Sequence, residues 1–159
     1  LPMVHKQWAF VLNGFVPDFR QSHMRALRSE LPDDLYGTLA GSSDSETLFL
    51  LAVSRIRDGT SMIRALIETA SRVKARVGST EAQLNMVMSD GESVVAVRTG
   101  TGLRTNSLYL AVHPSFAAGG AVLASEAPET GAAWTPVDEH SSVEILPDGT
   151  VTTEPIVLD

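Results

Sequence analysis

The order of apolar and polar residues along the chain predicts one strand, then helices, then a series of strands. Residues 7–12 are nearly all apolar and end at Asn13-Gly14, which is typical of a buried strand. Two later stretches repeat apolar residues at helical spacing, so we expect helices over 43–57 and 61–77. Ser43 with Glu46 three residues later predicts a capping box at the start of the first of these helices.

The second half reads as strands separated by turns. We expect strands over 82–88, 93–98, 107–112, 121–125, 141–146 and 151–158. Asp90-Gly91 and Asp148-Gly149 each predict a tight hairpin between two of these strands. A short helix over 18–29 and loops over 33–43, 114–120 and 127–133 complete the prediction. The pattern predicts an α+β domain whose second half is an antiparallel meander. The N-terminal strand has no evident pairing partner, which suggests that something upstream completes it.

Composition and charge narrow the function classes. The chain has 159 residues, 43% hydrophobic and 19% charged, which is typical of a single globular domain. A net charge of −7 argues against a general nucleic-acid binder, and no stretch approaches the roughly 18 apolar residues of a membrane span. The first residue is Leu1, so we expect a processed product or a part of a longer protein.

Cysteine and histidine usage excludes several chemistries within this chain. There is no cysteine, hence no disulfide and no cysteine nucleophile, and we expect a reducing, cytoplasmic location. The four histidines do not have metal-ligand spacing. They are His5, His23, His113 and His140. We expect neither a metal nor an organic cofactor.

Asn13-Gly14 has two interpretations. Asn-Gly is the preferred pair of a type I′ hairpin turn. Alternatively, an Asn side-chain amide and a Gly backbone N–H at a strand end supply the two convergent donors of an oxyanion hole. The sequence alone leaves both open.

Asp44 also has two interpretations. A carboxylate in the first turn of a helix is favoured by the helix dipole. Alternatively, Asp44 binds the ammonium group of a ligand at the helix start.

Several short motifs occur together in a characteristic order. Trp8 to Gly14 reads WAFVLNG, and Gly41 to Glu46 reads GSSDSE at the start of an apolar helix. Later come Leu84-Asn85-Met86, Ser107-Leu108-Tyr109, Ala124-Ser125-Glu126 and Trp134-Thr135-Pro136-Val137. Over nearly its whole length the chain resembles the class II glutamine amidotransferases, which are N-terminal-nucleophile hydrolases. The later motifs resemble the branch that contains the γ-glutamyl hercynylcysteine sulfoxide hydrolase of ergothioneine biosynthesis.

The resemblance implies a fold and a site. The fold would be an αββα sandwich, incomplete in this chain, with residues 1–159 as the C-terminal part of one such domain. Asn13 and Gly14 match the oxyanion pair, and Asp44 matches the acid that binds the substrate α-amino group. The family's catalytic Cys and its carboxylate-binding Arg would lie upstream of this chain, and Leu12 stands where the branch usually has His.

Two functions of different classes follow. The first is an amidohydrolase that cleaves a small γ-glutamyl amide, with its nucleophile supplied by an N-terminal fragment or another chain. A separate synthetase that takes up released ammonia remains open as a further partner. The alternative is a non-catalytic scaffold or binding subunit that has kept the fold and lost the chemistry.

Overall fold

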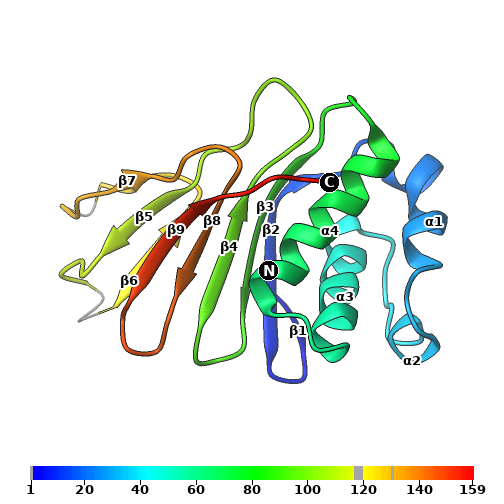
Figure 1. Ribbon diagram of the computed structural model, residues 1–159, viewed down its shortest axis with the longest axis horizontal. Helices are drawn as coiled ribbons and strands as arrows, with labels where there is room; N and C mark the ends of the chain where they lie inside the picture. The colour runs from blue at the N-terminus through cyan, green and yellow to red at the C-terminus, as the bar shows by residue number, and fades with distance from the viewer. Residues whose placement is uncertain (1, 117–119, 130) are drawn as a thin grey trace.

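A computed structural model describes residues 2–116, 120–129 and 131–159, and it forms three layers (Figure 1). The larger sheet has six strands in the order β1 (Met3–His5), β2 (Trp8–Phe15), β3 (Gln83–Ser89), β4 (Val94–Arg98), β8 (Ser141–Ile145) and β9 (Val151–Pro155). The smaller sheet has the order β6 (Ala121–Ala124), β5 (Tyr109–Val112) and β7 (Thr135–Pro136). The helices are η1 (Phe19–His23), α1 (Met24–Arg28), α2 (Asp33–Tyr36), α3 (Asp44–Arg57) and α4 (Met62–Val77).

One face of the larger sheet packs against α3 and α4. On β3, Leu84, Met86 and Met88 point to the helices and are fully buried. From β2, the ring of Phe10 stacks on Phe49 of α3, with ring centroids 5.4 Å apart. Burial of this apolar face against the helices forms the main core.

The opposite face of the larger sheet packs against the smaller sheet. Ala96 of β4 and Val143 of β8 are fully buried there, together with Leu108 and Val137 from the segments that lead into and out of the smaller sheet. The smaller sheet lies over β3, β4 and β8. Beyond its edge, Val11 and Phe15 of β2 remain 41% and 45% exposed.

The α+β prediction is confirmed, and so are the two long helices and both hairpins. Gly91 and Gly149 have φ values of 95° and 85° in the turns between β3 and β4 and between β8 and β9. The helices and paired sheets form three layers of the αββα sandwich that the resemblance implied. The described helices all lie on the same side of the larger sheet (Figure 1).

Four sequence predictions are corrected. The second half is not a simple meander, because the chain leaves the larger sheet after β4, builds the smaller sheet and returns as β8. The N-terminal strand does have partners, since β2 pairs with β1 on one side and β3 on the other. The helix predicted over 18–29 is the π-helical turn η1 followed by α1, and α2 lies in the predicted loop 33–43. Parts of the predicted loops 114–120 and 127–133, namely 117–119 and 130, lie outside the described residues.

Candidate functional site

Asn13 and Gly14 lie inside a strand and do not form a turn. β2 continues to Phe15, and Asn13 pairs with Asn85 of β3 in antiparallel register. The hairpin-turn interpretation is therefore wrong. Because side chains alternate along a strand, Asn13 points away from the helices, to the side of the smaller sheet.

Gly14 is required by the close approach of β2 and β3. A Cβ atom at this position would lie 1.8 Å from the carbonyl oxygen of Gln83, which is backbone and cannot move aside. Any side chain at position 14 would push the two strands apart. The packing of the sheet thus explains this glycine, whatever further role its N–H has.

A cavity of about 160 Å³ opens beside Asn13, between the two sheets. It is lined by Val11, Leu12, Asn13, Asn85, Val87, Leu108, Leu123, Ala124 and Ser125. Asn85, Leu108, Ala124 and Ser125 belong to the later motifs on which the family resemblance rests. The fold therefore brings these motifs, far apart in sequence, to the walls of one cavity that contains Asn13.

Asn106 connects the two asparagines of this cavity. Its side-chain Nδ2 donates to the backbone oxygen of Asn13 at 3.2 Å and lies 3.4 Å from Asn13 Oδ1. Its backbone oxygen accepts from Asn85 Nδ2 at 3.1 Å, and Asn85 Nδ2 also donates to the Ser107 oxygen at 2.8 Å. Asn85 is only 2% exposed, so its two bonds are partly buried, whereas the bonds between Asn106 and Asn13 are exposed.

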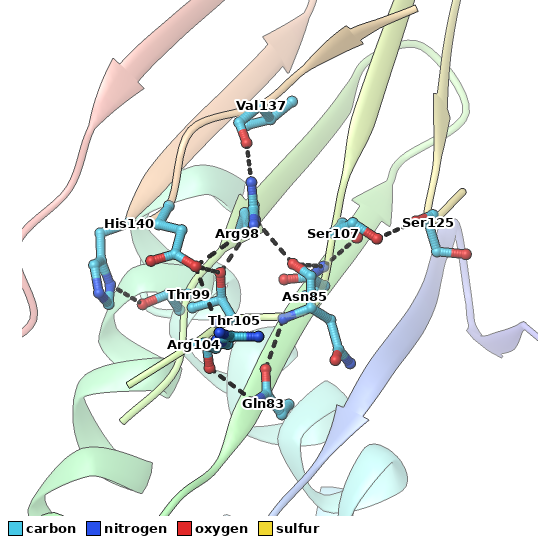
Figure 2. A network of polar contacts seen from close by, with 12 residues as sticks. Gln83, Asn85, Arg98, Thr99, Arg104, Thr105, Ser107, Ser125, Val137 and His140 are labelled. Carbon is cyan, nitrogen blue, oxygen red and sulfur yellow. Dashed lines mark hydrogen bonds and ion pairs between the residues drawn. The ribbon is translucent and has the colours of Figure 1, made fainter. Parts of the chain in front are cut away.

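A polar network anchors the loop that contains Asn106 (Figure 2). Arg98 Nε donates to the Asn106 oxygen at 2.8 Å, and its Nη1 donates to the Val137 oxygen. The N–H and hydroxyl of Thr105 both donate to Glu139 Oε1 at 3.1 Å. These two bonds, with the nearby Arg98 guanidinium, hold the pKa of the Glu139 carboxyl below its usual value.

Asp44 occupies the first position of α3, where it joins the helix to the sheet. Its Oδ2 accepts from the backbone N–H of Val16 at 2.8 Å, and its Oδ1 accepts from its neighbour Ser45 N at 2.7 Å. The N-cap is Ser43, whose Oγ accepts from Glu46 N at 3.2 Å, as the capping box predicts. The Glu46 carboxylate instead binds the N–H groups of Ala40 and Gly41.

The fold brings Asp44 near the end of β2 but not into the Asn13 cavity. Asp44 lines a separate hollow of about 370 Å³, bordered by η1 and by residues 42–44. Its link to Asn13 and Gly14 is the hydrogen bond to Val16, two residues beyond Gly14.

Sequence reasoning missed Asn85, Asn106 and Arg98 as parts of this site. The sequence shows only that Gln83 and Asn85 alternate with apolar residues on β3, and the structure shows that both are buried. Polar residues buried in this way need partners. Gln83 Oε1 accepts from the Asn106 N–H at 2.7 Å, which completes the anchoring of the loop.

Within 2–116, 120–129 and 131–159, no three His, Asp or Glu side chains are grouped to hold a metal ion. His140 Nδ1 lies 3.0 Å from the Thr99 hydroxyl. None of the helices in the described ranges is long and apolar enough to cross a membrane.

Comparisons with solved structures define the class of fold. The whole chain superposes on 71% of a glutamine aminotransferase class-II domain protein from Silicibacter pomeroyi, with a TM-score of 0.82 and 25% identity. It also superposes on 32% of the glutamine phosphoribosylpyrophosphate amidotransferase from B. subtilis, with a TM-score of 0.65 and 20% identity. A protein from Pseudomonas aeruginosa described as a predicted glutamine amidotransferase gives a TM-score of 0.57 at 15% identity, over 95% of this chain and 62% of that one.

The fold is that of a class II glutamine amidotransferase-like domain, with mixed α and β structure and antiparallel sheets. This fold supports a general amidotransferase or amidohydrolase role. No protein-family model and no curated protein sequence matches the chain.

Proposed function

We propose that residues 1–159 form part of a class II glutamine amidotransferase-like amidohydrolase. It cleaves a γ-glutamyl amide by acyl transfer to a Cys at the start of a segment outside this chain. The observation that supports this most is the Asn13 carboxamide, which lines the cavity between the sheets and is held by Asn106. An amide donor fixed in this way suits the stabilisation of a developing oxyanion.

The proposed reaction is an acyl transfer through a thioester. The thiol proton of the Cys passes to the α-amino group of the same residue, and the sulfur attacks the γ-carbonyl carbon. A C–S bond forms, and the negative charge on the oxygen is stabilised by Asn13 Nδ2 and Gly14 N–H. The C–N bond then breaks, and the proton moves from the α-amino group to the leaving amine. Water cleaves the thioester and restores the thiol.

Asp44 binds the α-ammonium end of the substrate in this proposal. Each of its oxygens already accepts one backbone hydrogen bond. A carboxylate has about four acceptor positions, so it can receive an ammonium N–H as well.

The uncovered face of β2 supports docking of the segment that supplies the nucleophile. Val4, Val11 and Phe15 are exposed on the same face as Asn13, and Val11 also lines the cavity. This chain accounts for 71% of the S. pomeroyi neighbour, whose remainder lies outside the match. We therefore propose residues 1–159 as the C-terminal part of one domain. A thiol nucleophile stays reduced in the cytoplasm, which is the location that we propose.

The substrate within this class is a γ-glutamyl amide, either glutamine or a γ-glutamyl conjugate. The motifs around the cavity favour the branch that acts in ergothioneine biosynthesis, and hence a conjugate. A separate synthetase would be needed only if the released ammonia is transferred.

The test is to purify the protein from its own cells without denaturation and to determine intact mass and N-terminal sequences. We expect a polypeptide that begins with Cys, either separate from or continuous with residues 1–159, and release of glutamate from γ-glutamyl amides. A lone species of 17.0 kDa without activity would contradict the proposal.

That outcome would favour the scaffold alternative. One observation is consistent with this alternative. Each oxygen of Asp44 accepts a backbone hydrogen bond, so the fold alone can explain an aspartate at this position.

A further inference from the structure

Asn13 and Asn85 place two side-chain amides in the wall of one cavity. They are direct partners across the β2–β3 ladder, and both point to the side of the smaller sheet. The remaining walls are apolar except for Ser125. Hydrogen bonds are strengthened in such surroundings, and an unpaired polar group is costly there.

The orientation of the Asn85 amide follows from its partners. The oxygen and nitrogen of an Asn amide are told apart by the hydrogen bonds they make. One branch of Asn85 faces two backbone carbonyls, those of Asn106 and Ser107, so this branch must be the donor Nδ2. The other branch is therefore Oδ1, which is buried and has no hydrogen-bond partner in the described part of the chain.

The orientation of the Asn13 amide follows in the same way. The Asn106 branch that faces the Asn13 backbone oxygen must be a donor, which assigns it as Nδ2. The Asn13 branch beside that donor is then Oδ1, at 3.4 Å. Asn13 Nδ2 is the branch that faces away from Asn106.

We propose that this pair binds the scissile carboxamide of the substrate as a matched donor and acceptor. Asn13 Nδ2 donates to the carbonyl oxygen, and Asn85 Oδ1 accepts from the amide N–H of the leaving group. Asn106 sets both orientations, the first through its side chain and the second through its backbone oxygen. The inference rests on the proposed function and adds to it a specificity-determining residue, Asn85.

Selectivity for amides over esters follows from this arrangement. A γ-glutamyl ester has an oxygen where the amide has N–H, so it gives Asn85 Oδ1 no donor and brings two acceptors together. A site built to accept a hydrogen bond rejects an analogue that lacks the donor. Removal of Asn85 Oδ1 should therefore impair amide cleavage more than ester cleavage.

The first test uses Asn85→Leu in the protein that contains its nucleophile segment. We expect the ratio of kcat/KM for a γ-glutamyl amide to that for the matching γ-glutamyl methyl ester to fall about tenfold, the effect of one lost hydrogen bond. The matched control is Gln83→Leu, because Gln83 anchors the same loop but does not line the cavity. In this control both rates should fall by the same factor. Equal losses for amide and ester in Asn85→Leu would overturn the inference.

The second test does not depend on catalysis or on a variant. Acetamide or methyl acetate is added to the ¹⁵N-labelled wild-type chain, and the side-chain NH₂ signals of Asn13 and Asn85 are followed by NMR. We expect acetamide to shift both pairs of signals and methyl acetate to leave those of Asn85 unchanged. Identical responses, or no response, would overturn the carboxamide site. If acetamide alone shifts the Asn85 signals but the protein hydrolyses no γ-glutamyl amide, the carboxamide site stands and only the proposed function is contradicted.

Discussion

The carboxylate of Asp44 accepts a hydrogen bond from the backbone N–H of Val16 at 2.8 Å, and this bond joins the start of α3 to the end of β2. The contact spans 28 residues of sequence. It lies just beyond Gly14. A change at Asp44 can therefore affect both the stability of the fold and the proposed binding of the substrate's α-ammonium group. Experiments at this residue must separate the two effects.

Substitution of Asp44 by Asn should weaken γ-glutamyl substrate binding by about 1.5–3 kcal/mol, the usual strength of a hydrogen bond to a charged group. The Asn oxygen can still accept from Val16, and only the bond from the neighbouring Ser45 N–H is lost, so the melting temperature should fall only slightly. Glutamine and larger γ-glutamyl amides should be affected equally, because they share the α-ammonium group. Michaelis constants and thermal unfolding measure the two effects.

Asp33→Asn is the matched control for this substitution, since Asp33 also begins a helix but lies outside both cavities. It should leave the Michaelis constant unchanged. An unchanged constant in Asp44→Asn, together with a large fall in melting temperature, would mean that Asp44 serves the fold alone.

Truncation of Asn13 to Ala should lower kcat by about 10²–10³, as loss of an oxyanion donor does. The Michaelis constant should change little, because the donor acts mainly on the transition state. Asn13 is exposed, so stability should be nearly unchanged. Gln7→Ala, which removes an exposed amide in the turn between β1 and β2, is the control. A kcat within a factor of three of wild type would remove Asn13 from the oxyanion hole.

Replacement of Gly14 by Ala should destabilise the fold by about 1–3 kcal/mol or more, because the new methyl group overlaps the Gln83 carbonyl. Gly37→Ala is the matched control, since its nearest contact would be an ordinary 3.4 Å and its φ is −65°. Urea unfolding of both variants checks the difference. Equal stability of the two would contradict the close approach of β2 and β3.

Acid should loosen the loop that contains Thr105 and Asn106. The bonds from Thr105 lower the pKa of Glu139 in the folded protein, so Glu139 stabilises this loop above the ordinary Glu pKa of about 4.3. That contribution is lost as the pH falls through the lowered value. A carboxyl ¹³C titration should place the Glu139 midpoint below that of free Glu, and the Thr105 N–H signal should move with it. In Glu139→Gln the Thr105 signal should no longer titrate in this range.

Local signals predicted the two long helices, α3 and α4, and both Asp-Gly hairpins. Ser61 and Gly78 bound α4 as the sequence indicates, because capping depends on neighbouring residues alone. The strand β1 was missed, since only its pairing with β2 makes three residues a strand. The departure of the chain into a second sheet after β4 was missed for the same reason, because alternation along a strand does not tell which strand lies beside it.

The site was predicted in part. Asn13, Gly14 and Asp44 came from motifs, and whether they bind substrate stays a prediction. The sequence did not predict Asn85 as a site residue, although Asn85 belongs to one of the motifs. The alternation of polar and apolar residues along β3 indicates a strand whose polar face is in contact with solvent. The smaller sheet and the 99–107 loop cover that face, and this depends on contacts between distant segments.

The hydrogen bonds between Asn13 and Asn106 span 93 residues, and this separation bears on how the protein folds. The α3–α4 pair is a local unit that can form early, whereas closure of so long a loop is slow. The cavity between the sheets should therefore be among the last parts to become ordered during refolding. Competence to bind a carboxamide would then report that the chain has finished folding, and should lag behind the recovery of helical circular dichroism.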